Sequence, residues 1–180
     1  MTGTTDVTVP PIRSVAVLGA GTMGAQIAAH LANAGIEVLL LDLDRATAAS
    51  GLDRAAKLSP DPFFSRDLKR RIKLGGFDDD LAAVGECDWI VEAIVERLDI
   101  KQALLEKVDG HRRADAIVSS NTSGIPIGAI AEGRSEGFRQ HWLGTHFFNP
   151  PRYLRLVEVI PTPDTDPAVV TAISDFVDRQ

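Results

Sequence analysis

Residues 15–42 read VAVLGAGTMGAQIAAHLANAGIEVLLLD, and this stretch decides the fold. A short apolar run opens it and leads at once into a glycine-rich turn. The residues after the turn carry apolar side chains at helical spacing, and Gly35 is placed to end that helix. A second apolar run, too short for a second helix, then ends on the acid Asp42. The order predicted is therefore strand, glycine turn, helix and strand.

The glycine turn has the spacing G-x-G-x-x-G, and each glycine has a different physical task. Gly19 permits the tight turn out of the strand, and Gly21 lets a pyrophosphate approach the backbone. Gly24 allows the helix to lie close to the strand. The free N–H groups at the start of the helix favour a phosphate there. The turn is thus predicted to bind a dinucleotide, although glycines that only serve the packing of the turn remain an alternative.

The acid at the end of the second strand selects among dinucleotides. Asp42 lies eighteen residues after Gly24, where its carboxylate can accept hydrogen bonds from the adenosine ribose. A carboxylate at this place repels the 2′-phosphate of NADP, so NAD is the expected cofactor. Arg45 is the one feature that keeps NADP open, and FAD, which uses the same fingerprint, stays a second alternative.

Beyond Asp42, helical and strand-like segments alternate, which predicts an α/β fold. We expect helices at 45–58, 66–74, 98–108, 126–131 and 167–177, and strands at 89–91, 116–118, 142–148 and 154–160. The fold class predicted is a Rossmann-type, doubly wound and mainly parallel sheet, with a helical hairpin inserted after the second strand. The second helix of that hairpin is basic, which indicates either a solvated charged face or a patch for a phosphate-bearing substrate tail. Its cations are Arg66, Lys69, Arg70, Arg71 and Lys73.

Ligands of such sheets bind at the carboxyl ends of the strands. The polar candidates at these ends are Gly19–Gly24, Asp42, Glu96, Asn121–Ser123 and His146. If the strands around His146 and Glu158 pair antiparallel, residues whose numbers sum to about 304 face each other, and these two form a pair. Such a pair suits a general base with an orienting carboxylate, whereas the alternative is a hydrogen-bonded core histidine. Ser123 could bind a substrate oxygen or could cap the helix that follows it.

Composition narrows the class of protein further. The 180 residues carry a net charge of −6, which argues against nucleic acid as the main partner. A single cysteine, Cys87, excludes an internal disulfide and favours a cytoplasmic setting. No apolar run approaches a membrane span, no histidine or cysteine spacing suits a metal, and residues 1–12 read as a flexible leader before a domain at 13–180.

Four blocks together resemble the NAD-binding domain of the 3-hydroxyacyl-CoA dehydrogenases of fatty-acid β-oxidation, most closely the long-chain bacterial branch. They are GAGTMG at 19–24, EAIVE at 92–96, SNTS at 120–123, and HFFNP at 146–150 followed by LVEVI at 156–160. The HFFNP block is the most specific. The resemblance covers residues 13–180 and implies an NAD-dependent oxidation of 3-hydroxyacyl-CoA.

The resemblance also implies roles for single residues. His146 would be the general base, Glu158 would orient it, and Ser123 would bind the substrate oxygen near the nicotinamide. The positions that match cofactor contacts are Gly19, Ala20, Gly21, Thr22, Met23, Gly24, Asp42, Ile94, Val95, Glu96, Lys101, Ser123 and Asn149. The hairpin after Asp42 would dock part of coenzyme A.

The family carries a second, helical domain that supplies an active-site asparagine and the dimer interface. No candidate for that asparagine is found in this sequence. We therefore expect a fragment of a longer enzyme, one that binds NAD and forms a homodimer only with the missing domain. Two alternatives stay open: an NAD-binding module without activity in this form, and a dehydrogenase of another 3-hydroxy acid.

Overall fold

The computed structural model describes residues 9–179. Its strands are β1 (Ser14–Leu18), β2 (Glu37–Asp42), β3 (Ile72–Gly76), β4 (Trp89–Glu92), β5 (Ile117–Ser120), β6 (Trp142–Phe147) and β7 (Val157–Pro161). Its α-helices are α1 (Thr22–Asn33), α2 (Arg45–Ala55), α3 (Leu98–Asp109), α4 (Ile127–Ile130), α5 (Glu136–Gln140) and α6 (Pro167–Arg179). Two 3₁₀ helices, η1 (Arg66–Arg71) and η2 (Leu81–Glu86), complete the elements.

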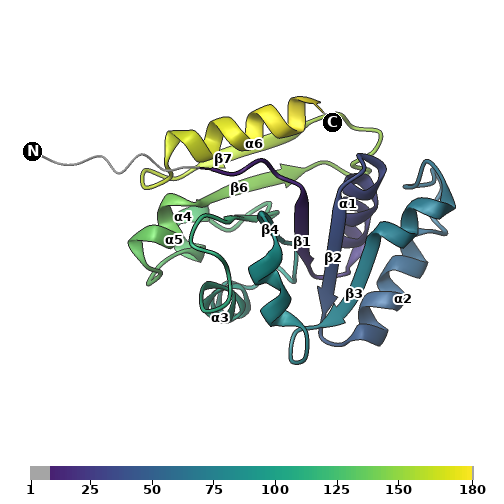
Figure 1. Cartoon of the computed structure of the whole chain (residues 1–180), viewed down its shortest axis with the longest axis horizontal. Coiled ribbons are helices and arrows are strands. Elements are labelled where there is room, and N and C mark those ends of the chain that lie inside the picture. The colour runs from purple at the N-terminus through teal and green to yellow at the C-terminus, as the bar shows by residue number, and fades with distance from the viewer. Residues whose placement is uncertain (1–8, 180) are drawn as a thin grey trace, which may run out of the picture.

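The strands form one seven-stranded sheet in the order β3-β2-β1-β4-β5-β6-β7. All neighbours run parallel except β6 and β7, which are antiparallel. The chain proceeds from β1 outward to β2 and β3, and then crosses to β4 on the other side of β1 (Figure 1). This reversal is the switch point of a doubly wound sheet, as the alternation of elements predicted.

Alternate side chains of the central strands feed two cores. Val15 and Val17 enter a cluster with α1, α2 and α6, whereas Ala16 and Leu18 enter a cluster with η2, α3, α4 and α5. Each core is buried because helices cover both faces of the sheet. Figure 1 shows α6 lying along β6 and β7, and α2 beside β3.

The predicted helical hairpin is wrong in its second half. The segment expected as a helix at 66–74 forms the short η1 and then β3, which pairs in parallel with β2. Ile72 is buried, Lys73 is exposed and Leu74 is half-buried, a two-residue alternation that suits a strand. The edge of β2 offers unpaired backbone groups, and pairing with them outweighs the helix propensity of the segment.

Three smaller points concern the ends of the chain and its helices. A flexible leader was predicted for residues 1–12. Residues 1–8 lie outside the described residues. Val9 and Ile12 pack against the first core. The short helix α5 was not anticipated; the Ser135 hydroxyl caps it by accepting a hydrogen bond from the Phe138 N–H. Among residues 9–179, every helix is too short or too polar to cross a membrane.

Candidate functional site

A cleft of about 900 Å³ lies at the switch point, where β1 and β4 end. Its walls come from the glycine turn, the end of β2, the segment after β4 and the segment after β5. The lining residues are Gly19, Gly21, Thr22, Met23, Asp42, Leu43, Phe77, Ala93, Ile94, Val95, Glu96, Ile100, Asn121, Ser123 and Gly124. Most of the residues predicted to contact a cofactor therefore line one cleft.

The glycine turn has the geometry that a dinucleotide requires. Gly19 has a φ of +102°, a conformation that other residues rarely adopt, and a Cβ on Gly24 would overlap the carbonyl oxygen of Gly19. A Cβ on Gly21, in contrast, would meet no atom within 4 Å, because this residue faces the open cleft. No side chain caps the N-terminus of α1, and its first turn holds no acid, so its N–H groups can receive a phosphate.

Asp42 connects the end of β2 to this turn. One carboxylate oxygen accepts a hydrogen bond from the Ala20 N–H at 2.6 Å, and the other accepts from the Leu43 N–H at 2.7 Å. Each carboxylate oxygen has a second lone pair, so the group can still accept a ribose hydroxyl. The carboxylate is thus held in a fixed place at the wall of the cleft, which fits its predicted role.

A buried ion pair lies behind the cleft. The side chains of Glu92 and Lys101 are 0% and 1% exposed, and Lys101 Nζ lies 2.7 Å from Glu92 Oε1. The same ammonium lies 3.2 Å from Glu96 Oε2, at the wall of the cleft. Glu92 also accepts hydrogen bonds from the Ile94 N–H and the Ser120 hydroxyl, so this buried charge is fully paired. Lys101, a predicted cofactor contact, therefore lies behind Glu96 in this structure.

Glu96 holds the segment that follows β5. Its Oε1 accepts hydrogen bonds from the Thr122 hydroxyl and from the N–H groups of Ser123 and Gly124. Desolvation opposes the charged form, but these hydrogen bonds and the Lys101 ammonium together lower the pKa of Glu96 to about 2. Glu96 is thus a carboxylate at any physiological pH, and it fixes where Ser123 lies.

A chain of hydrogen bonds joins Ser123, His146 and Glu158. The antiparallel register of β6 and β7 pairs His146 with Glu158, as the sum of 304 predicted. His146 Nδ1 lies 2.8 Å from Glu158 Oε2, and His146 Nε2 lies 3.0 Å from Ser123 Oγ. Three side chains from three separate segments therefore form a continuous hydrogen-bonded series.

The direction of these hydrogen bonds follows from the groups themselves. A carboxylate only accepts, so Nδ1 of His146 must carry the proton in the bond to Glu158. In the neutral ring Nε2 then has the free lone pair, and it accepts a hydrogen bond from the Ser123 hydroxyl. The arrangement can therefore take up a proton at Nε2 beside a second hydroxyl group.

Two polar residues of this region, Gln26 and Glu92, were not singled out from the sequence as functional. Gln26 donates a hydrogen bond to Asn149, and Glu92 pairs with Lys101. Thr122, one of the predicted polar candidates, donates a hydrogen bond to Glu96. The signals were a glutamine on an apolar helix face and an acid at the end of a buried strand. Asn149 itself lies two residues after β6 and is exposed.

The basic segment after α2 is largely neutralised by neighbouring acids. Lys69 lies 2.5 Å from Asp53, and Arg71 lies 2.8 Å from Glu37. Arg70 pairs with Asp67 at 3.4 Å in the same 3₁₀ helix. These pairs favour the solvated charged face over a dedicated phosphate patch.

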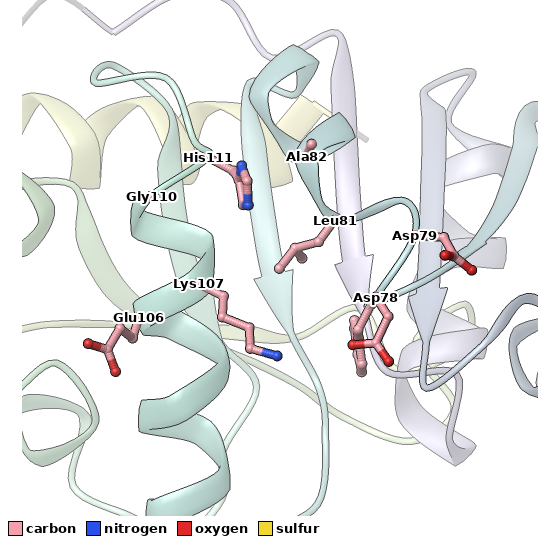
Figure 2. Close-up of a pocket in the computed structure, with 9 residues that line it drawn as sticks. Asp78, Asp79, Leu81, Ala82, Glu106, Lys107, Gly110 and His111 are labelled. Carbon is pink, nitrogen blue, oxygen red and sulfur yellow. The ribbon is translucent and has the colours of Figure 1, made fainter.

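A second hollow, of about 480 Å³, lies between α3 and the segment that leads into η2 (Figure 2). Charged side chains of both signs line it, among them Asp78, Asp79, Glu106 and Lys107. Of the residues that line the cofactor cleft, Phe77 also lines this hollow. Within residues 9–179 no group of histidine, cysteine and acidic side chains is arranged to hold a metal ion.

Comparison with known proteins gives a consistent result. Residues 14–180 match the family described as 3-hydroxyacyl-CoA dehydrogenase, NAD binding domain. A relative from Deinococcus radiodurans, described as a probable 3-hydroxyacyl-CoA dehydrogenase, is 52% identical over 175 residues, which are 93% of this chain and 51% of that protein. A relative from Bacillus subtilis with the same description is 45% identical over 186 residues, covering 92% of this chain and 24% of that protein.

A solved structure agrees with these relatives. The (S)-3-hydroxybutyryl-CoA dehydrogenase of Ralstonia eutropha superposes with a TM-score of 0.76 at 32% identity, covering 93% of this chain and 60% of that one. This chain spans about half the length of the Deinococcus relative and about a quarter of the Bacillus relative.

Proposed function

Because this chain belongs to the family of 3-hydroxyacyl-CoA dehydrogenase NAD-binding domains, we propose that it is the cofactor-binding and proton-transferring part of an (S)-3-hydroxyacyl-CoA dehydrogenase. The reaction is the oxidation of 3-hydroxyacyl-CoA to 3-oxoacyl-CoA in fatty-acid β-oxidation. The observation that carries the proposal is the series Ser123–His146–Glu158, which lies beside a cleft suited to a dinucleotide.

The cleft would offer partners for the pyrophosphate, the adenosine ribose and the nicotinamide half of NAD. The turn at Gly21 and the N-terminus of α1 would hold the pyrophosphate, and Asp42 would accept the adenosine ribose hydroxyls. Residues beyond β4, β5 and β6 would surround the nicotinamide half. They are Ile94, Val95, Glu96, Ser123 and Asn149, with Lys101 acting through Glu96.

Bound NAD⁺ supplies the acceptor for the hydride from C3 of the substrate. The protein's own task is the proton: Nε2 of His146 accepts it from the 3-hydroxyl group, and the adjacent Glu158 stabilises the imidazolium that forms. The Ser123 hydroxyl donates a hydrogen bond to Nε2 in this structure, and it would donate to the substrate oxygen instead when substrate is bound. In the reverse direction the protonated ring acts as the acid.

The remaining proposals concern the setting of the enzyme. An acyl-CoA would be the substrate partner. A homodimer would form through the further domain that the resemblance implies. The cytoplasm, where the single cysteine stays reduced, is the expected location.

Two measurements on the 180-residue chain test the proposal. NAD⁺ is titrated in a calorimeter, and NADH with acetoacetyl-CoA is then followed at the nicotinamide absorbance band. NAD⁺ binding is the expected result, and NADH oxidation in addition would mean that His146, Glu158 and Ser123 suffice for the chemistry. Binding without oxidation would support the alternative, an NAD-binding module that is inactive in this form, and activity on a free 3-oxo acid would support another 3-hydroxy acid as substrate. Absence of NAD⁺ binding would contradict the proposal altogether.

The general base is tested by His146→Gln in the complete enzyme; the new side chain has a similar reach but cannot take up the proton. Turnover is expected to fall about 10²–10⁴-fold, the usual contribution of a general base, with NAD⁺ affinity largely retained. His111→Gln, an exposed histidine beside the second hollow, is the control and should leave turnover unchanged. A loss of less than about tenfold in His146→Gln would contradict the assignment.

A further inference from the structure

Gln26 is a buried amide in the middle of α1. It is 3% exposed, although it is polar and the other buried residues of this helix are glycine, alanine, isoleucine and leucine. Its Nε2 donates to the Thr22 carbonyl oxygen at 2.8 Å and to Asn149 Oδ1 at 3.1 Å. A buried amide that spends both of its hydrogens on these two acceptors has one orientation only.

That orientation fixes the orientation of Asn149. The Thr22 carbonyl can only accept, so the atom of Gln26 that faces it must be the NH₂ group. The second hydrogen of the same NH₂ group points to Asn149, which must therefore present its oxygen. The NH₂ group of Asn149 is left facing away from Gln26, and within residues 9–179 it donates no hydrogen bond.

We propose that Gln26 is a positioning residue that turns the Asn149 NH₂ group toward an acceptor oxygen on the nicotinamide half of the cofactor. The inference rests on the proposed function, since it needs NAD in the cleft. It also depends on where Asn149 lies, three residues beyond His146 and beside the first turn of α1. The adenosine half would lie at Asp42, beyond the glycine turn and away from Asn149.

The chemistry of the acceptor follows from the free donor. An amide NH₂ group is complementary to a neutral or anionic oxygen, and the nicotinamide riboside offers ribose hydroxyl oxygens and a carboxamide oxygen. Gln26 touches neither the cofactor nor the substrate, because it is buried behind Thr22 and Asn149. It acts only by deciding which end of the Asn149 amide faces outward.

The first experiment compares two ligands in Gln26→Met, which preserves the volume of the side chain and removes both donors. NAD⁺ affinity should fall about three- to tenfold, the value of one hydrogen bond between neutral groups. ADP, which lacks the nicotinamide riboside, should bind as tightly as it does to the unmodified chain. The matched control is Gln102→Met, which removes a glutamine–carbonyl hydrogen bond from α3 to Ala129 and should leave the NAD⁺ to ADP affinity ratio unchanged.

A second experiment separates positioning from a merely structural role. In an Asn149→Ala background, Gln26→Met should cause no further loss of NAD⁺ affinity, because Gln26 acts through Asn149. Asn149→Asp, a surface change that keeps an oxygen toward Gln26 but removes the donor, should reproduce the NAD⁺-specific loss without altering the core.

Equal losses for NAD⁺ and ADP, full additivity with Asn149→Ala, or unchanged NAD⁺ affinity in Asn149→Asp would each overturn the inference. These outcomes are distinct from a failure of the proposed function, which would show as no NAD⁺ binding by the unmodified chain.

Discussion

Three carboxylates around the cleft accept hydrogen bonds from backbone N–H groups of nearby segments. They belong to Asp42, Glu92 and Glu96. Asp42 holds the glycine turn, Glu92 holds the start of the segment after β4, and Glu96 holds the segment that carries Ser123. A hydrogen bond to a charged group is stronger than one between neutral groups, so each of these loops is fixed before a ligand arrives. At this scale the cleft is preorganised by acids rather than by apolar packing.

The lowered pKa of Glu96 predicts an acid-dependent loss of stability. The carboxylate is favoured in the folded chain, so its contribution to the free energy of unfolding is complete above the unfolded value near 4.5. It is then lost as the pH falls toward about 2. Glu96→Gln should therefore flatten the fall in stability between pH 4.5 and 2, as measured by urea unfolding at each pH. Curves for the variant and the unmodified chain that stay parallel through this window would contradict the pKa direction.

At the scale of elements, the first turn of α1 packs directly against the glycine turn that precedes it. Gly24 lies against the Gly19 carbonyl, whereas Gly21 faces open space. The helix can approach β1 this closely only because Gly24 has no side chain. Beyond the turn, buried hydrogen bonds that join Trp89, Ser119 and Thr145 tie β4, β5 and β6 together, which aligns the strand ends that carry Ser123 and His146.

Matched alanine substitutions separate packing from binding in this element. Gly24→Ala should lower the free energy of unfolding by about 1–3 kcal/mol, because the new Cβ overlaps the Gly19 carbonyl. Gly21→Ala should change stability by less than about 1 kcal/mol and yet weaken NAD⁺ binding, since its Cβ would occupy the space of the pyrophosphate. Chemical unfolding and calorimetric titration of both variants check this. Equal loss of stability in the two variants would contradict the separate tasks.

At the scale of the whole molecule, one sheet separates two cores. Trp89 belongs to the core beneath α1 and α6, and Trp142 belongs to the core beneath α3 and α5. Both side chains are 0% exposed, and they are the two tryptophans of the chain. Because β1 supplies side chains to both cores, neither core can open without removing the support of the other.

Single-tryptophan variants should show this coupling. In Trp142→Phe the fluorescence reports the first core, and in Trp89→Phe it reports the second. In each variant we expect the fluorescence transition to coincide with the loss of far-ultraviolet circular dichroism in urea, because the shared sheet makes unfolding cooperative. A fluorescence midpoint that departs from the dichroism midpoint in either variant would show that one core melts separately.

The sequence by itself determined the local features. G-x-G-x-x-G between two apolar runs, followed by Asp42, predicted the strand–turn–helix unit and the cofactor, because glycine conformation and hydrophobic period act within a few residues. The sequence also predicted that His146 faces Glu158 if their strands pair antiparallel, because the register of such a pair decides which residues lie opposite each other.

Tertiary structure alone decided what depends on distant partners. Residues 72–76 became an edge strand rather than a helix, because the free edge of β2 offered backbone hydrogen bonds that local propensity does not include. The hydrogen bond from Gln26 to Asn149 likewise joins segments far apart in the chain. The burial of Lys101 between Glu92 and Glu96 joins nearby residues, but it requires α3 to pack against the end of β4. Such contacts arise from how α1, α3 and the strand ends pack, and no pattern within one segment encodes them.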